Sequence, residues 1–400
     1  MIYTLQAPPL IQTKVRLPAS KSISNRVLIL NALSKSSCPI ENLSDSDDTE
    51  VLRKSLQSSD SGFDIGAAGT SMRFLTAYLS QQSGEWSITG SERMKNRPIG
   101  LLVDALRQLG AEIEYIEKEG FPPLRILGKK LQGGTVVLNG GVSSQYISAL
   151  LMIAPCLKKG LTLCLEGNIV SKPYIHMTLE LMKTFGVRAH WKDSVIEIQP
   201  QSYHPVPFRV ESDWSAASYW YEIKALAPEN SRIELIGLEE NSLQGDAKVA
   251  EIFRILTSPS LWRGSGEGLH YDFTNEPDLA QTVVVTCCFL NIPFRFIGLQ
   301  SLRIKETDRL SALQTELRKL GYIIREEAGS ILEWKGERCV AEPHPVIATY
   351  DDHRMAMTFA PVCLKTGEIR IENPEVISKS YPHYWDDLID AGFRINNENR

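Results

Sequence analysis

Residues 303–309, RIKETDR, combine cations and a carboxylate directly before a predicted helix. Lys305 and Arg309 are four residues apart and Glu306 and Arg309 three, so all three side chains can reach one patch. The positive end of a helix attracts anions, and a carboxylate beside it can deliver a proton. The pattern is typical of a site that binds and protonates an anionic ligand. A solvated helix start with surface ion pairs has the same residues and remains the simpler interpretation of this string alone.

Further cations lie beside short polar clusters elsewhere in the chain. They are Lys21 and Arg26 in PASKSISNR, Arg97 in RMKNRPIG, Arg354 in YDDHRMAM and Lys379 in SKSYPHY. The chain of 400 residues has a formal net charge of −5, which argues against a nucleic-acid-binding surface. Cations that cluster locally in an acidic chain therefore indicate a small anionic ligand.

The composition predicts a globular protein with two domains of ordinary size. Apolar residues make up 43% of the chain and charged residues 23%. The seven cysteines show no CxxC spacing and lie mostly in apolar runs, so we expect buried free thiols of a cytoplasmic protein, with neither a zinc site nor a disulfide framework. The first residues, MIYTLQAPPL, lack a secretory signal pattern, and no apolar run has the length of about 18 residues that a membrane span needs.

One local design recurs six times: a small or polar cluster followed by a strongly apolar helix. The clusters lie at 20–22, 69–71, 143–145, 213–215, 278 and 351–353. Between positions 20, 69, 143, 213, 278 and 352 the separations are 49, 74, 70, 65 and 74 residues. Near-regular recurrence of one design predicts six copies of one supersecondary unit.

Amphipathic helices alternate with the apolar ones. We expect them at 99–109, 176–185 and 308–320, each ended by a glycine and followed by a short alternating strand. Each unit is therefore predicted as strand, buried helix, strand, surface helix, strand. If the starts of these helices lie at one end of a domain, they would attract anions. Ordinary N-capping nevertheless explains each polar cluster taken singly. Three units per domain divide the chain near 210–213.

Eight strings in the chain resemble the 5-enolpyruvylshikimate-3-phosphate synthase family. They are PASKSISNR, GTSMR, RMKNRPIG, VSSQY, SKPYI, KETDR, DDHRMAM and SKSYP, in this order and over nearly the whole chain. The resemblance implies an α/β (α+β) fold with the two-domain enolpyruvyl-transferase architecture. Each domain would hold three βαβαββ units with buried parallel helices, an inside-out α/β barrel. Residues 18–211 would form one domain and 1–17 with 212–400 the other, with the active site in the cleft between them.

The resemblance also implies a reaction. The enolpyruvyl (1-carboxyvinyl) group of phosphoenolpyruvate moves to the 5-hydroxyl of 3-phosphoshikimate and phosphate is released, a shikimate-pathway step toward chorismate and aromatic amino acids. The family implies a cytoplasmic monomer without a metal, an organic cofactor, or a nucleic-acid or membrane partner. Both substrates carry a phosphate and a carboxylate, which is a physical reason for so many cations.

By motif position the resemblance assigns roles to individual residues. Asp278 takes the proton from the attacking hydroxyl, Glu306 protonates the methylene carbon, and Lys21 lies between the two ligands as a third catalytic residue. The 3-phosphoshikimate site comprises Lys21, Ser22, Arg26, Ser143, Ser144, Gln145, Ser171, Tyr174, Asp278 and Lys305. The phosphoenolpyruvate site comprises Lys21, Gly69, Arg97, Gln145, Arg309, Arg354 and Lys379. From residue type alone, an N-cap for Asp278 and a half-buried core position for Tyr174 are the better interpretations.

The chain departs from the family pattern at several positions. Ala67 stands where many members have Asn, Phe74 where Pro is common, and Ser301 where some members have Asn. Segments 58–62 and 259–268 are expected to be shortened strands or hairpins.

Two other functions stay open. The enolpyruvyl transferase that acts on a UDP-aminosugar shares the fold, but its loop with a reactive cysteine has no counterpart here, and KETDR and SKSISNR favour the shikimate enzyme. The second alternative is an anion-binding protein that has lost the catalytic reaction, although Asp278 and Glu306 would serve no purpose in such a protein.

Overall fold

The computed structural model describes residues 1–258 and 268–398. The chain divides into two compact units. We call Ala19–Glu211 the middle unit, and Met1–Pro18 with Ser212–Arg400 the terminal unit. The chain therefore passes between the units twice, after Pro18 and after Glu211.

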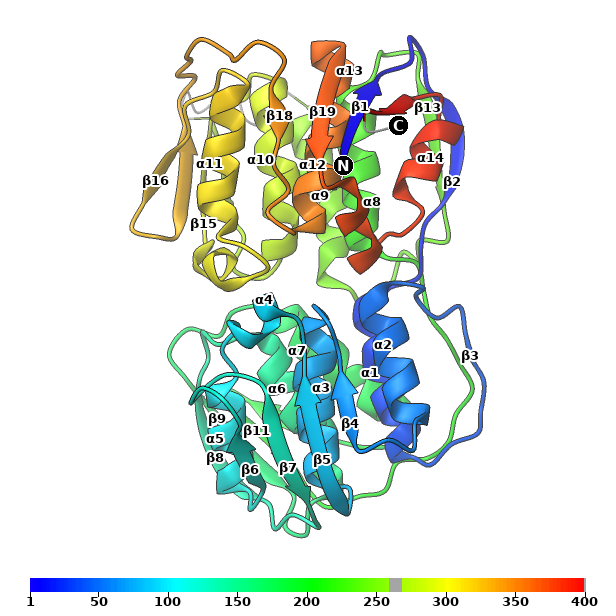
Figure 1. Cartoon of the computed structure of the whole chain (residues 1–400), viewed down its shortest axis with the longest axis vertical. Coiled ribbons are helices and arrows are strands. Elements are labelled where there is room, and N and C mark those ends of the chain that lie inside the picture. Colours follow the sequence, from blue (N-terminus) through cyan, green and yellow to red (C-terminus); the bar gives the residue numbers. More distant parts are fainter. Residues whose placement is uncertain (259–267, 399–400) are drawn as a thin grey trace. The chain divides into compact units, whose positions relative to one another are not determined.

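The middle unit is built from buried helices, surface helices and three sheets. The helices are α1 (Lys21–Leu33), α2 (Asp47–Gln57), α3 (Gly69–Ser80), α4 (Glu92–Lys95), α5 (Gly100–Gln108), α6 (Ser144–Ile153) and α7 (Lys172–Thr184). One sheet has the order β4 (Gly62–Asp64), β5 (Gly84–Thr89), β7 (Leu124–Gly128), β6 (Glu112–Tyr115). The second has the order β10 (His190–Lys192), β11 (Val195–Ile198), β9 (Leu161–Glu166), β8 (Gly134–Asn139), and β12 (Phe208–Arg209) pairs with β3 (Ile40–Glu41). Figure 1 shows β4, β5 and β7 side by side, and α3 packs on β5 and β7.

The terminal unit repeats this plan. Its helices include α8 (Trp214–Leu226), α9 (Val249–Leu256), α10 (Ala280–Phe289), α11 (Arg309–Lys319), α12 (His353–Phe359), α13 (Cys363–Thr366) and α14 (Tyr384–Asp390). Its sheets have the orders β14 (Leu269–Asp272), β15 (Phe294–Ile297), β17 (Ile331–Trp334), β16 (Arg325–Glu327) and β18 (Val346–Ile347), β19 (Glu368–Glu372), β1 (Ile2–Gln6), β20 (Arg394–Asn397). A third pair joins β13 (Arg232–Ile236) to β2 (Gln12–Arg16).

Three of the apolar helices, α3, α10 and α12, are buried on nearly all sides, which explains why they lack an amphipathic pattern. Every residue of α10 and α12 is buried, and so are eleven of the twelve residues of α3. Buried hydroxyls link the terminal unit's three apolar helices, since Thr282 Oγ1 lies 3.3 Å from both Ser218 Oγ and Thr358 Oγ1. The hydrophobic core of each unit therefore forms around these helices.

Four of the six expected repeats show the full order strand, helix, strand, helix, strand, strand. They are β4–β7 with α3 and α5, β8–β11 with α6 and α7, β14–β17 with α10 and α11, and β18–β20 with α12 and α14. The last repeat is completed by β1 from the start of the chain, which pairs with both β19 and β20 (Figure 1). In the remaining two repeats, around β3 and β2, the described residues form only two paired strands each, which differs from the expectation.

Several local expectations are confirmed and others need correction. Asp308 caps α11 by accepting from the amides of Leu310 and Ser311, and α11 ends before Gly321 as its spacing predicts. Helix α7 begins at Lys172 rather than at 176. Of the cysteines, only Cys287, Cys288 and Cys363 are buried, and the other four are half-buried.

Two further points concern the limits of these elements. The expectation that segment 259–268 is a shortened strand or hairpin is not tested, because residues 259–267 lie outside the described residues. Among the helices that the structure describes, none is long and apolar enough to cross a membrane.

Candidate functional site

In the middle unit, polar contacts tie the starts of four helices together. Lys21 Nζ, at the start of α1, lies 3.9 Å from Asp48 Oδ2 in the first turn of α2. Asp48 Oδ1 accepts from the Ser71 amide at 3.1 Å and from its hydroxyl at 2.7 Å, at the start of α3. Gln145 Nε2, at the start of α6, donates to Thr70 Oγ1 at 3.3 Å. The predicted polar openings therefore converge at one end of this unit.

Gly69 and Arg97, both assigned to phosphoenolpyruvate, are in direct contact. A Cβ atom built on Gly69 would lie 2.5 Å from Arg97 Nη1, so a larger residue at 69 would displace the guanidinium. Arg73 holds Gly69 and the residue after Arg97 together, because it donates to the Gly69 carbonyl at 3.0 Å and to the Pro98 carbonyl at 3.1 Å. Burial, and next the charge of Arg97, lowers the pKa of Arg73 to about 10, so Arg73 stays cationic at neutral pH. Arg73 belongs to the GTSMR string, and no site role was predicted for it.

Arg26, assigned to 3-phosphoshikimate, is only 2% exposed and is bonded within its own unit. Its guanidinium donates to Thr178 Oγ1 at 2.7 Å, Ser148 Oγ at 2.9 Å and the Ser22 carbonyl at 2.8 Å. The rings of Phe74 and Tyr174 lie 5.5 and 5.9 Å from its guanidinium carbon. Burial lowers the pKa of Arg26 to about 10. Arg26 therefore links α1, α6 and α7. The ring of Phe74, which stands where Pro is common in the family, lies against the Arg26 guanidinium group.

The four serines assigned to 3-phosphoshikimate lie at helix starts, and Ser22 is the second residue of α1. Ser143 caps α6 by accepting from the Gln145 amide at 3.3 Å, and Ser144 is the first residue of that helix. Ser171 precedes α7 with a left-handed backbone (φ 55°). Among the described residues, the N-cap residues of α1, α3 and α7, which are Ser20, Ala68 and Ser171, make no side-chain cap hydrogen bond, and in α3 the Ser71 amide donates to Asp48 instead.

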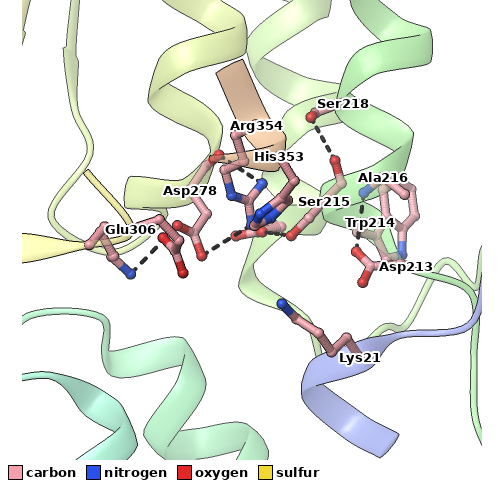
Figure 2. Close-up of polar contacts among 12 residues, drawn as sticks. Lys21, Asp213, Trp214, Ser215, Ala216, Ser218, Asp278, Glu306, His353 and Arg354 are labelled. Atoms are coloured by element: carbon pink, nitrogen blue, oxygen red, sulfur yellow. Dashed lines mark hydrogen bonds and ion pairs between the residues drawn. The ribbon is translucent and has the colours of Figure 1, made fainter. Parts of the chain in front are cut away.

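In the terminal unit, Asp278 is surrounded by three cations, and Figure 2 shows one of them, Arg354, beside it. Its Oδ1 lies 2.9 Å from Arg309 Nη1 and 3.5 Å from Lys305 Nζ, and its Oδ2 lies 3.3 Å from Arg354 Nη2. Burial by itself raises the pKa of Asp278, but Arg354, Lys305 and Arg309 together hold that pKa well below its usual value. Asp278 lies in a 3-10 turn (Pro277–Leu279) before α10 and is not the N-cap of this helix, so the capping interpretation is wrong.

Arg309 joins three carboxylates at the start of α11. It donates to Asp352 Oδ2 at 2.7 Å, Glu306 Oε2 at 2.8 Å and Asp278 Oδ1 at 2.9 Å. Although burial by itself lowers the pKa of Arg309, the carboxylates of Asp352, Glu306 and Asp278 raise it above its usual value. The spacing in RIKETDR thus predicted correctly that Lys305, Glu306 and Arg309 share one patch.

The start of α12 brings the last two assigned cations together. Asp352 caps this helix through the Arg354 amide at 2.9 Å. Arg354 Nη1 donates to Tyr219 Oη and to the Asp278 carbonyl, both at 3.2 Å. Lys379 Nζ donates to the Asp351 carbonyl at 2.5 Å, so Lys379 lies next to the turn that begins α12.

Two buried acids, Asp246 and Glu276, lie near Asp278 and were not predicted from the sequence. Asp246 accepts from the hydroxyl of Ser215, which follows the α8 cap (Figure 2), and burial, with Asp278 as the next cause, raises the pKa of Asp246 to about 6. Burial, with Asp246 as the next cause, raises the pKa of Glu276 to about 7. Both acids lie outside the recognised motifs. Glu276 is two residues before Asp278 in the sequence, whereas only the fold brings Asp246 near Asp278.

Together the fold and the two clusters define a two-unit α/β protein equipped to bind anions and move protons. A family model described as EPSP synthase (3-phosphoshikimate 1-carboxyvinyltransferase) matches residues 5–58 and 51–388. The chain therefore belongs to the EPSP synthase family.

Individual relatives agree with this assignment. A protein of Bacteroides fragilis named 3-phosphoshikimate 1-carboxyvinyltransferase is 57% identical over 406 residues, which cover 99% of each chain. A Vibrio cholerae protein of the same name is 38% identical over 420 residues, covering 96% of this chain and 97% of that one. The structure of EPSP synthase from Acinetobacter baumannii has a TM-score of 0.77 over 99% of this chain and 100% of that one, and at 20% identity this likeness shows the fold alone.

Proposed function

We propose that this chain transfers the enolpyruvyl group of phosphoenolpyruvate to the 5-hydroxyl of 3-phosphoshikimate and releases phosphate. The observation that carries the proposal is the position of the Asp278 carboxylate, which lies within 3.5 Å of Lys305, Arg309 and Arg354. The proposal is also supported by a relative named 3-phosphoshikimate 1-carboxyvinyltransferase, to which this chain is 57% identical. Three cations around one ionised carboxylate suit anionic substrates and a proton acceptor at the same place.

The reaction has an addition and an elimination. The 5-hydroxyl oxygen bonds to C2 of phosphoenolpyruvate while Asp278 takes the hydroxyl proton and Glu306 gives a proton to the C3 methylene. Loss of phosphate from C2 and of one proton from the new methyl group then forms the enol ether. An arriving phosphate shares the cations around Asp278, which weakens their hold on the carboxylate and makes Asp278 a stronger base.

The middle unit supplies most of the groups for binding. Lys21, at the start of α1, contacts both substrates and is the third catalytic residue. Arg97, resting on Gly69, and Gln145 bind phosphoenolpyruvate with Arg309, Arg354 and Lys379 of the terminal unit. The 3-phosphoshikimate phosphate binds to Ser143, Ser144, Gln145 and Ser171, which lie at helix starts, and Ser22 and Tyr174 complete that site with Lys305 and Asp278. Arg26 acts by holding Ser22 and Tyr174 in place.

The proposal includes the finer architecture. The three repeats of each unit form an inside-out α/β barrel with parallel buried helices, and both clusters serve one pair of substrates. The protein works as a cytoplasmic monomer and uses neither a metal nor an organic cofactor.

Phosphate release tests the proposal directly. The purified chain is expected to release phosphate from phosphoenolpyruvate only when 3-phosphoshikimate is present, in a one-to-one ratio with the enol ether product. UDP-N-acetylglucosamine serves as the control acceptor for the aminosugar enzyme. Release with this acceptor instead would identify the aminosugar reaction. Binding of both substrates without release would identify a protein that only binds anions.

A further inference from the structure

The turn before α12 has an unusual backbone. Tyr350 and Asp351 are consecutive non-glycine residues with left-handed φ angles of 54° and 56°. Such conformations are costly for L-residues and persist only where surrounding structure holds them. This turn leads into Asp352 and Arg354, and its Asp351 carbonyl accepts from Lys379. Whatever holds the turn therefore also sets the positions of two cations of the site.

Glu316, in the second half of α11, holds the segment that precedes the turn. The residue is fully buried, and its carboxylate accepts from the Ala348 amide at 3.1 Å and from Tyr350 Oη at 2.7 Å. Lys319 Nζ lies 2.7 Å from the same carboxylate and donates to the Val346 carbonyl at 2.9 Å. Both oxygens of Glu316 are thus engaged, and residues 346–350 are fastened to α11.

The two ends of α11 act on the two sides of the left-handed pair. Arg309 and Glu316 are seven residues apart, which places them on the same face of the helix two turns apart. Arg309 bonds Asp352, just after the pair, and Glu316 bonds Tyr350, the first residue of the pair. One face of one helix therefore fixes the turn from both sides.

We propose that Glu316 and Tyr350 form a latch that positions Arg354 and Lys379 for phosphoenolpyruvate, an inference that rests on the proposed function. Both are positioning residues, because they act through the 350–354 turn and not by touching substrate. Without the Tyr350 hydroxyl, the strained turn relaxes and the two cations lose their fixed geometry.

The test compares Tyr350→Phe with Tyr203→Phe. The control removes an equally short hydrogen bond in the middle unit, where Tyr203 Oη donates to the Met152 carbonyl at 2.7 Å. We expect Tyr350→Phe to raise KM for phosphoenolpyruvate about 3- to 10-fold, the worth of one hydrogen bond, with kcat and KM for 3-phosphoshikimate within about twofold. Glu316→Gln is expected to raise the same KM, and the double variant to add little to either single variant because both break one latch. Tyr203→Phe is expected to leave KM for phosphoenolpyruvate unchanged.

Hydrogen–deuterium exchange supplies a readout that does not depend on activity. Peptides covering 346–356 are expected to exchange faster in Tyr350→Phe than in the wild type, and not in Tyr203→Phe. Unchanged exchange overturns the latch whatever the wild-type activity, and faster exchange with an unchanged KM for phosphoenolpyruvate overturns its positioning role. Equal effects on both substrates also overturn it, since general destabilisation would produce them. A wild type that releases no phosphate would refute the proposed function instead, while the exchange comparison still decides whether the latch exists.

Discussion

The two units gather helix starts in the same way but treat their positive ends differently. In the terminal unit, Asp213, Asp308 and Asp352 cap α8, α11 and α12 with carboxylates. In the middle unit, the Ser143 hydroxyl caps α6, and among the described residues the N-cap residues of α1, α3 and α7 make no side-chain cap hydrogen bond. The Asp48 carboxylate accepts from the Ser71 amide at the start of α3. A carboxylate cap neutralises the positive end of a helix, whereas an uncapped start keeps both its charge and its amides for a ligand.

The cations of the two units also differ in how closely carboxylates contact them. Arg309 is held by three carboxylates at 2.7–2.9 Å, whereas Lys21 lies 3.9 Å from Asp48. The terminal unit thus pairs its charges internally, which preorganises carboxylates for proton transfer. The middle unit offers hydroxyls at helix starts, and among the described residues its Arg26 is bonded to neutral oxygens and not to carboxylates, which favours the capture of anions. From this comparison we expect variants of the terminal unit's carboxylates to reduce turnover and variants of the middle unit's binding groups to weaken substrate affinity.

The largest effect is expected from Glu306→Gln. The amide keeps the size of the side chain and can still contact Arg309, but it has no acidic proton for the methylene carbon. We expect kcat to fall about 10²- to 10⁴-fold, with smaller changes in the affinity for both substrates. Single-turnover kinetics with calorimetric binding separates the two quantities. Normal turnover in this variant would make Glu306 a structural partner of Arg309.

The complementary variant is Arg97→Ala in the middle unit. Loss of a charge-assisted hydrogen bond is expected to weaken phosphoenolpyruvate binding by about 1.5–3 kcal/mol. The affinity for 3-phosphoshikimate alone serves as the internal control, because Arg97 is assigned to the other substrate. If kcat fell as steeply as in Glu306→Gln while phosphoenolpyruvate still bound normally, the division between a binding unit and a proton-transfer unit would be wrong.

Much of the fold follows from local patterns, because its buried helices are apolar on every side and polar clusters mark their starts. The spacing in RIKETDR likewise predicted the patch of Lys305, Glu306 and Arg309. Long-range pairing was out of reach: β1 completes a sheet through partners such as Tyr3 and Ile371, which no local pattern links. Capping rules suggested an N-cap for Asp278, yet its carboxylate bonds cations distant in the sequence, including Lys305.

A third prediction concerns stability and pH. Glu222 in α8 is fully buried, and burial raises its pKa well above the usual value. The folded state therefore binds this proton more tightly than the unfolded state, and the unfolding free energy falls as pH rises above about 4.5. Glu222→Gln carries no such proton, so we expect it to be more stable relative to the wild type at pH 8 than at pH 5. Urea unfolding at both pH values measures this difference. An equal difference at the two pH values would mean that Glu222 is ionised in the folded protein.

The smallest effect is expected from Asp246→Asn, and its size depends on pH. The pKa of Asp246 is raised to about 6, first by burial and then by Asp278, so the side chain is largely neutral at pH 5 and charged at pH 8. Repulsion between the two carboxylates is mutual, and a charged Asp246 therefore makes Asp278 a stronger base. Asparagine keeps the contact with the Ser215 hydroxyl but removes the charge. We expect kcat to fall about two- to threefold at pH 8 and to stay unchanged at pH 5, in a profile measured with both substrates saturating. A loss of the same size at both pH values would show that Asp246 acts through its hydrogen bond to Ser215, and the terminal unit would then tune its base by geometry and not by charge.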